Sequence, residues 1–138
     1  MQAEQEFKKI MAAQTEMALA TTAKGTPNVR IVNFIYDENK KIVYFATFKD
    51  NAKVREIAVN PHVAFTTIPR EGNAHVKAKG VASKSGLAIY DVVELFTAKI
   101  PGYRQTIEQV GPFLVLYEIQ FQEAVVTLDL DNIVTVTI

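Results

Sequence analysis

The pattern of apolar and polar residues along the chain predicts many short strands and a few short helices. Alternation with a period of two is clearest in residues 74–82, where small or apolar side chains alternate with charged ones. We therefore expect a strand there with one face in a core and the other toward solvent or a polar ligand. Runs of β-branched and aromatic residues bounded by turn residues predict further strands at 17–22, 29–36, 42–47, 62–68, 113–122, 125–130 and 133–138.

A helical spacing of apolar residues predicts the helices. Phe7, Ile10 and Met11 lie at i, i+3 and i+4 in an otherwise charged opening segment. A second helix is expected at 52–59, capped by Asp50 or Asn51 and ended by a proline. A third, with Ser83 or Ser85 as its cap, carries an apolar stripe that ends before the proline at position 101, and a short fourth helix is expected at 103–110.

Short connections restrict how the strands can pair. The turns at 23–27 and 37–40 are too short for a parallel crossover, so the strands at 17–22, 29–36 and 42–47 are expected to form an antiparallel meander. No repeat, low-complexity segment or linker divides the sequence. We therefore predict a mainly β fold with short helices over residues 1–138, as one domain built on a closed or nearly closed antiparallel barrel.

Composition excludes several function classes. The 138 residues contain 15 basic and 15 acidic side chains, which gives no basic excess of the kind that nucleic-acid binding requires. There is no cysteine, so disulfides and thiol catalysis are excluded, and the two distant histidines predict no metal site. No apolar run approaches the length of a membrane span and the N-terminal segment has no signal pattern, so we expect no membrane association and a cytoplasmic location.

Three polar residues suggest a site for an anion. Arg30 interrupts an apolar strand, Thr47 ends the next strand, and Lys53 lies in the first turn of the helix that follows. The free N–H groups and the dipole of a helix start favour a phosphate, and a charged side chain in a buried strand needs a partner. The alternative is that Arg30 lies in an edge strand and reaches water. We expect Lys53 to lie at an exposed helix start and Glu56 on a polar helix face.

No catalytic residue can be assigned from the sequence. The carboxylates show no pairing suited to glycoside or peptide hydrolysis, the six glycines form no phosphate-binding fingerprint, and no serine lies in a G-x-S-x-G setting. A hydrolase is therefore not expected.

The order and spacing of five segments resemble a known family. These segments are residues 19–22, 28–32, 43–47, 51–64 and 75–82. They resemble the FMN-binding split-barrel proteins, the pyridoxamine 5′-phosphate oxidase-like group, and among these the small general-stress-protein type. The resemblance implies an antiparallel split β-barrel and a homodimer with FMN at its interface.

The resemblance also implies roles for individual residues. Arg30 would reach the flavin and its phosphate, and the strand end at 45–47 would line the flavin. Asn51 and Lys53 would match the phosphate segment, while His75 and Lys77 would match residues that approach the ring or phosphate. The residues so implied to bind the cofactor are Arg30, Ile31, Val32, Phe45, Ala46, Thr47, Asn51, Lys53, His75 and Lys77.

Departures from the family pattern argue against pyridoxamine 5′-phosphate oxidase activity itself. Asn51 replaces a serine, Ile35 stands where the oxidase has a lysine, and His75 replaces a glutamine; the oxidase's C-terminal substrate motif is missing from the sequence. Two hypotheses follow. The protein is an FMN-dependent oxidoreductase that acts on a small-molecule substrate, or it binds and stores a flavin, a deazaflavin or a heme without turnover. In the heme variant, His62 or His75 would be the axial ligand.

Overall fold

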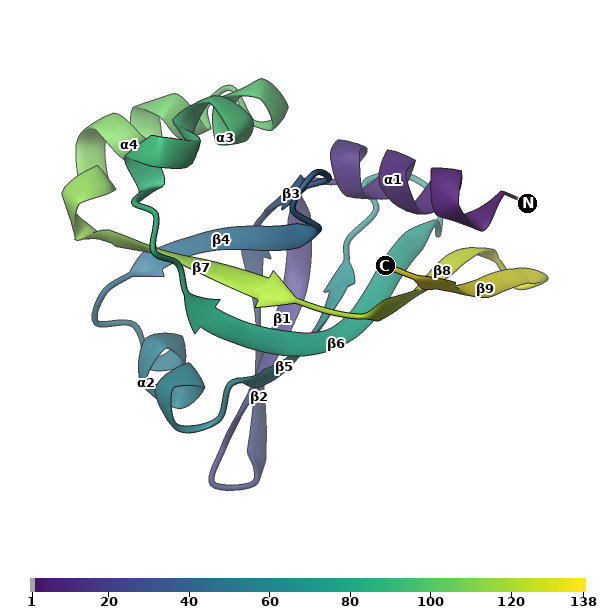
Figure 1. Cartoon of the computed structure of the whole chain (residues 1–138), viewed down its shortest axis with the longest axis horizontal. Helices are drawn as coiled ribbons and strands as arrows, with labels where there is room; N and C mark the ends of the chain where they lie inside the picture. The colour runs from purple at the N-terminus through teal and green to yellow at the C-terminus, as the bar shows by residue number, and fades with distance from the viewer. Residues whose placement is uncertain (1) are drawn as a thin grey trace.

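The computed structural model of the protein describes residues 2–138, in which a nine-stranded antiparallel sheet is flanked by short helices (Figure 1). The strands are β1 (Glu16–Ala23), β2 (Thr26–Asn33), β3 (Ile35–Asp37), β4 (Ile42–Phe48), β5 (His62–Thr67), β6 (His75–Lys84), β7 (Leu114–Gln120), β8 (Glu123–Asp129) and β9 (Asn132–Thr137). The helices are α1 (Ala3–Ala13), α2 (Ala52–Val59), α3 (Val93–Lys99) and α4 (Tyr103–Val110). The predicted mainly β fold with short helices is confirmed.

The chain breaks at Phe34, so the predicted single strand over residues 29–36 and the three-stranded meander are wrong. β2 pairs with β1 at one end of the order β2-β1-β5-β6-β7-β4-β3, and β3 pairs with β4 at the other end. Phe34 is fully buried, and its N–H donates to the carbonyl of Thr15 at 3.1 Å. Its burial redirects the chain from one end of the sheet to the other. Within residues 2–138 no ladder joins β2 to β4, which leaves the barrel split there.

The barrel interior holds the larger of two apolar clusters. Phe34, Phe45, Phe65 and Ile119 lie at its centre, and α1 closes one end with Phe7, Ile10 and Met11. The predicted alternation in β6 is confirmed, since Val76 and Ala78 are buried whereas Lys77 and Lys79 are exposed. Both faces of this part of the sheet are therefore defined by the sequence pattern alone.

A second cluster fills the space between the outer faces of β4 and β7 and the helices α3 and α4 (Figure 1). Tyr44 and Leu116 point into it from the sheet. From the helices, Phe96 stacks on Tyr103 with the ring centres 4.6 Å apart. β7 is consequently buried on both faces, and its predicted first residue, Phe113, instead lies exposed just before it. The predicted third helix is also divided, into a 3₁₀ turn at Ile89–Val92 and α3.

Lys99, the last residue of α3, ties three elements together. Its ammonium donates at 3.0 Å to the carbonyl of Met11 in α1 and at 3.0 Å to that of Phe34, and lies 3.6 Å from the centre of the Phe34 ring. Burial lowers the pKa of this amine to about 7. Its contacts hold the chain at the point where β2 ends and β3 begins.

No helix among residues 2–138 combines the length and the apolar character needed to cross a membrane.

Candidate functional site

A pocket of about 250 Å³ lies at the split in the barrel, between the end of β2 and the end of β4. The start of α2 and one side of α4 complete its walls. Because β2 pairs only with β1 within the described residues 2–138, its other edge leaves backbone N–H and C=O groups without ladder partners at this position. The pocket is lined by Ile31, Val32, Asn33, Ala46, Thr47, Phe48, Asn51, Lys53, Tyr103, Thr106, Val110 and Leu114.

Six of the ten predicted cofactor residues line this pocket. They come from three separate segments, which the fold brings together: Ile31, Val32, Ala46, Thr47, Asn51 and Lys53. Phe45 does not contribute its ring, since the side chain is fully buried in the barrel and stacks on Tyr117 at 5.5 Å. Thr47 lies on the same face of β4 as Phe45, but two residues further along, where the strand ends at the pocket.

Lys53 is the central polar group of the pocket. Its side chain is not at an exposed helix start, as the sequence suggested, because the residue is only 6% exposed. Burial, and then the positive charge of Arg30, lower the pKa of its amine. No carboxylate of residues 2–138 lies within 4.0 Å of the ammonium. A buried cation without a counter-ion is costly, and an anionic ligand would supply the missing charge.

The start of α2 places Lys53. Asn51 is the N-cap, as predicted, and its side-chain oxygen accepts a hydrogen bond from the backbone N–H of Lys53 at 3.2 Å. Thr47, which is 5% exposed, faces the same pocket from the end of β4. The pocket thus combines a hydroxyl, an ammonium and a helix start, three groups that favour a phosphate.

Arg30 already has a protein partner. Its guanidinium donates to Glu56 Oε1 at 3.0 Å, to Thr21 Oγ1 at 2.7 Å and to the carbonyl of Leu19 at 3.3 Å. These contacts compensate the positive charge of Arg30 within the protein. Neither the expected anionic ligand nor the alternative, contact with water at an edge strand, is needed to compensate it. The predicted polar helix face for Glu56 is wrong, since the side chain is 10% exposed and also accepts from Asn28. The Asn28 bond, followed by the charge of Arg30, lowers the pKa of the Glu56 carboxyl.

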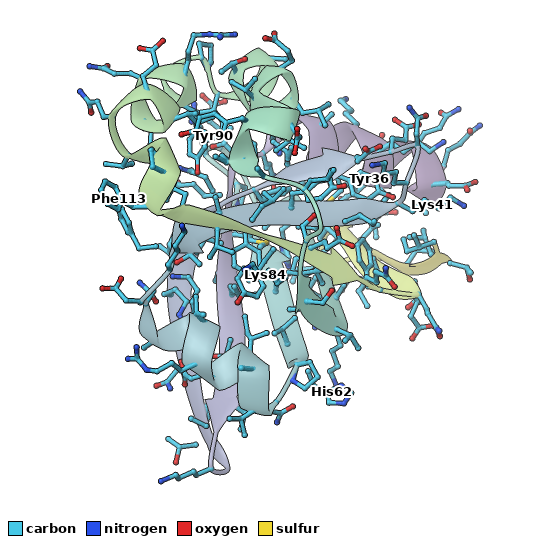
Figure 2. The ribbon with its side chains drawn as sticks, turned by 60° about the vertical axis from the view of Figure 1, so that its left-hand side comes forward. Tyr36, Lys41, His62, Lys84, Tyr90 and Phe113 are labelled. Atoms are coloured by element: carbon cyan, nitrogen blue, oxygen red, sulfur yellow. The ribbon has the colours of Figure 1, made fainter. Side chains whose placement is uncertain are left out.

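His75 and Lys77 lie away from this pocket on β6. The Nδ1 atom of His75 is 2.6 Å from the carbonyl oxygen of Asn73. Lys77 borders a separate, open hollow of about 1590 Å³ across the outer faces of β1, β5 and β6, together with Lys79 and His62. Figure 2 shows His62 at the lower end of the sheet, well apart from Phe113, which precedes the pocket residue Leu114. The hollow is larger than the pocket, but its charged groups are exposed. It is lined by one of the predicted cofactor residues, Lys77, whereas the pocket is lined by six.

α4 contributes a wall of the pocket that the sequence analysis did not assign. Tyr103, Thr106 and Val110 line the pocket and lie on one helix face at i, i+3 and i+7. Burial raises the pKa of the Tyr103 phenol, so the phenol stays protonated near neutral pH and offers a hydrogen-bond donor. The helical spacing was visible in the sequence, but nothing in it indicated which part of the sheet this face covers.

Within residues 2–138, no group of three or more His, Cys, Asp or Glu side chains is arranged to hold a metal ion.

Comparisons of sequence identify the family of the chain. A family model described as pyridoxamine 5′-phosphate oxidase-like matches residues 10–133. A pyridoxine/pyridoxamine 5′-phosphate oxidase from Crocosphaera subtropica is 37% identical over 89 residues, which are 62% of this chain and 39% of that protein. The chain therefore spans well under half the length of this curated relative.

Solved structures share the fold. General Stress Protein 26 from Bacillus anthracis aligns over 100% of both chains with a TM-score of 0.78 and 17% identity. A heme-binding protein from Mycobacterium smegmatis aligns over 99% of this chain and 58% of its own, with a TM-score of 0.78 and 16% identity. An FAD-binding protein from Mesorhizobium loti aligns over 88% and 89%, with a TM-score of 0.67 and 15% identity.

Proposed function

Because the chain belongs to the pyridoxamine 5′-phosphate oxidase-like family, we propose that it binds FMN without a covalent bond in the pocket between β2 and β4 and acts as a flavin-dependent oxidoreductase on a small molecule. One observation carries the proposal. The Lys53 side chain is largely buried, its ammonium has no carboxylate within 4.0 Å among residues 2–138, and it shares the pocket with Thr47 and the start of α2.

The residues present fit the polar half of FMN. Lys53 would bind the phosphate with a charge-assisted hydrogen bond, and the Thr47 hydroxyl would donate a second bond. Asn51 uses its side-chain oxygen for the helix cap, which leaves its N–H₂ group as a further donor. Ile31, Val32 and Ala46 provide apolar walls, and the unpaired edge of β2 offers backbone groups to a polar ring edge.

The pocket is too small to hold the whole cofactor. Its volume of about 250 Å³ is below the range of roughly 300–1,000 Å³ that is typical of sites for drug-sized ligands. Ile31 is 62% exposed and Phe48 is 47% exposed at its mouth. We infer that a second copy of the chain covers the ring here, which makes the protein a homodimer with FMN at the interface. Any contact of His75 or Lys77 with FMN then requires the second copy.

Exposed apolar side chains support this association surface. Val29 is 69% and Val81 is 44% exposed, on strands adjoining the pocket and the outer hollow. The apolar side chains on the outer faces of β4 and β7 are mostly covered by α3 and α4. The surface proposed for association therefore lies on β2 and at the pocket mouth instead.

Bound FMN supplies hydride or single-electron transfer. The protein's own residues would fix the phosphate, exclude water from the pocket and keep a proton on the Tyr103 phenol. No carboxylate or histidine of residues 2–138 lines the pocket, so no residue is assigned as a general base.

Heme or deazaflavin storage without turnover is the second candidate. Its support is the outer hollow, where exposed His62 lies with Lys77 and Lys79, groups suited to an axial ligand and to acidic side groups of a planar ligand.

Titration of the purified protein with FMN, riboflavin and hemin separates these proposals. We expect saturable FMN binding that is tighter than riboflavin binding, and reduction of the bound flavin by NADH or NADPH with reoxidation by an added acceptor. Absence of binding at high micromolar FMN would overturn the FMN proposal. A Soret band on hemin addition that is lost in His62→Ala would favour storage of heme.

A further inference from the structure

Arg30 lies close enough to Lys53 for its charge to lower the pKa of the Lys53 amine, yet of these two cations only Arg30 has a carboxylate within 4.0 Å among residues 2–138. Glu56 lies one turn after Lys53 on α2 and binds Arg30 at 3.0 Å. Its carboxylate does not lie within 4.0 Å of the Lys53 ammonium. The helix therefore carries an acid that neutralises the cation on β2 and leaves the cation in the pocket uncompensated.

The position of Glu56 is set by more than one contact. Asn28 donates to its second carboxylate oxygen, and Thr21 Oγ1 lies 3.4 Å from the first. Thr21 in turn accepts from Arg30 at 2.7 Å. Glu56 is thus held against Arg30 by side chains from β1 and β2, close to the strand segment that lines the pocket.

We propose that Glu56 is an internal anion that binds Arg30 and competes with the phosphate of the ligand for it. The inference rests on the proposed function, since it concerns the same site. Arg30, Lys53 and Glu56 together carry a formal charge of +1, whereas a phosphate monoester carries about −1.5 to −2 near neutral pH. Glu56 therefore limits how strongly the site distinguishes FMN from riboflavin, which lacks the phosphate.

The test compares Glu56→Gln with the wild-type protein in titrations with FMN and with riboflavin. Glutamine preserves the size of the side chain and an oxygen acceptor for Asn28, but it removes the charge. We expect FMN to bind about tenfold more tightly, the difference of roughly 1.4 kcal/mol between a charge-assisted and a neutral hydrogen bond, with riboflavin changed by less than about twofold. In an Arg30→Ala background the same substitution should leave the FMN affinity unchanged.

Glu94→Gln is the matched control, because it also removes one acid from an arginine pair, Glu94 with Arg104 at 3.3 Å, on the exposed surface of α3. It should alter neither affinity. Glu56→Asp serves if the glutamine variant does not fold, since it keeps the charge but shortens its reach to Arg30. That variant too should tighten FMN more than riboflavin.

An unchanged or weaker preference for FMN over riboflavin in these variants would overturn the inference and identify the Arg30–Glu56 pair as a fixed structural tie. The proposed function would stand in that case, because the wild-type protein still binds FMN. Failure of every variant and of the wild-type protein to bind FMN would overturn both.

Discussion

Replacing Lys53 by methionine tests the central claim about the pocket. Methionine matches the buried length of lysine but has no charge. If Lys53 binds the phosphate, the substitution removes one charge-assisted hydrogen bond, worth roughly 1.5–3 kcal/mol, and FMN affinity should fall about ten- to a hundredfold. Riboflavin affinity should barely change, because it has no phosphate. Fluorescence titration of both flavins measures the two affinities.

The same variant should fold at least as well as the wild-type protein. The Lys53 side chain is largely buried and its ammonium has no ion-pair partner among residues 2–138, so its removal relieves a desolvation cost. Lys49→Met is the control, because Lys49 is exposed just before α2 and its loss changes the net charge equally. Equal losses for FMN and riboflavin in Lys53→Met would show that Lys53 does not bind the phosphate.

Three further predictions follow from other parts of the structure. Asn51→Ala removes the cap of α2 and should lower the free energy of unfolding by about 0.5–2 kcal/mol in chemical denaturation. The pKa of Lys99, about 7 in the folded chain, lies below its unfolded value, so between these two pKa values the unfolded state binds more protons than the folded state. The free energy of unfolding should therefore rise from pH 7 to pH 9 by at most about 1.4 kcal/mol per pH unit. This rise should be smaller in Lys99→Met. Light scattering should give the mass of a dimer. Ile31→Lys should disrupt both the dimer and FMN binding, whereas Leu130→Lys, at an exposed turn, should disrupt neither. A monomeric wild-type protein with FMN present would contradict the shared interface.

Much of the fold could be predicted because local patterns decided it. The amphipathic spacing of Phe7, Ile10 and Met11 predicted α1, and a cap at Asp50 or Asn51 with the proline at position 61 predicted α2, for which the structure selects Asn51. The break at Phe34 could not be predicted, because an apolar aromatic residue continues a strand pattern equally well. Only its burial in the barrel, with the contacts from Thr15 and Lys99, shows that the chain changes partner strands there.

The candidate site, too, has parts that could be predicted from the sequence and parts that could not. Arg30, Thr47 and Lys53 were identified from their polar character and positions, and their neighbours in segments 30–32, 46–47 and 51–53 through a resemblance. The fold brings residues from all three segments to one pocket. The partner of Arg30 could not be inferred, since Glu56 is 26 residues away and reaches Arg30 only through the orientation of α2 against β1 and β2. The pocket wall formed by α4 could not be inferred either, because it depends on packing between elements that are distant in the sequence.

The break at Phe34 also explains why the pocket lies where it does. A strand continuing through Phe34 would keep β2 beside β4 and close the barrel along the edge where Ile31, Val32 and Asn33 now border the pocket. Because the chain instead turns at Phe34, that edge stays open and its backbone groups face the pocket. Lys99 holds this turn through the carbonyl of Phe34 although it does not line the pocket. The shape of the site is therefore determined by core residues outside it, whereas its charge is determined by Lys53, Arg30 and Glu56.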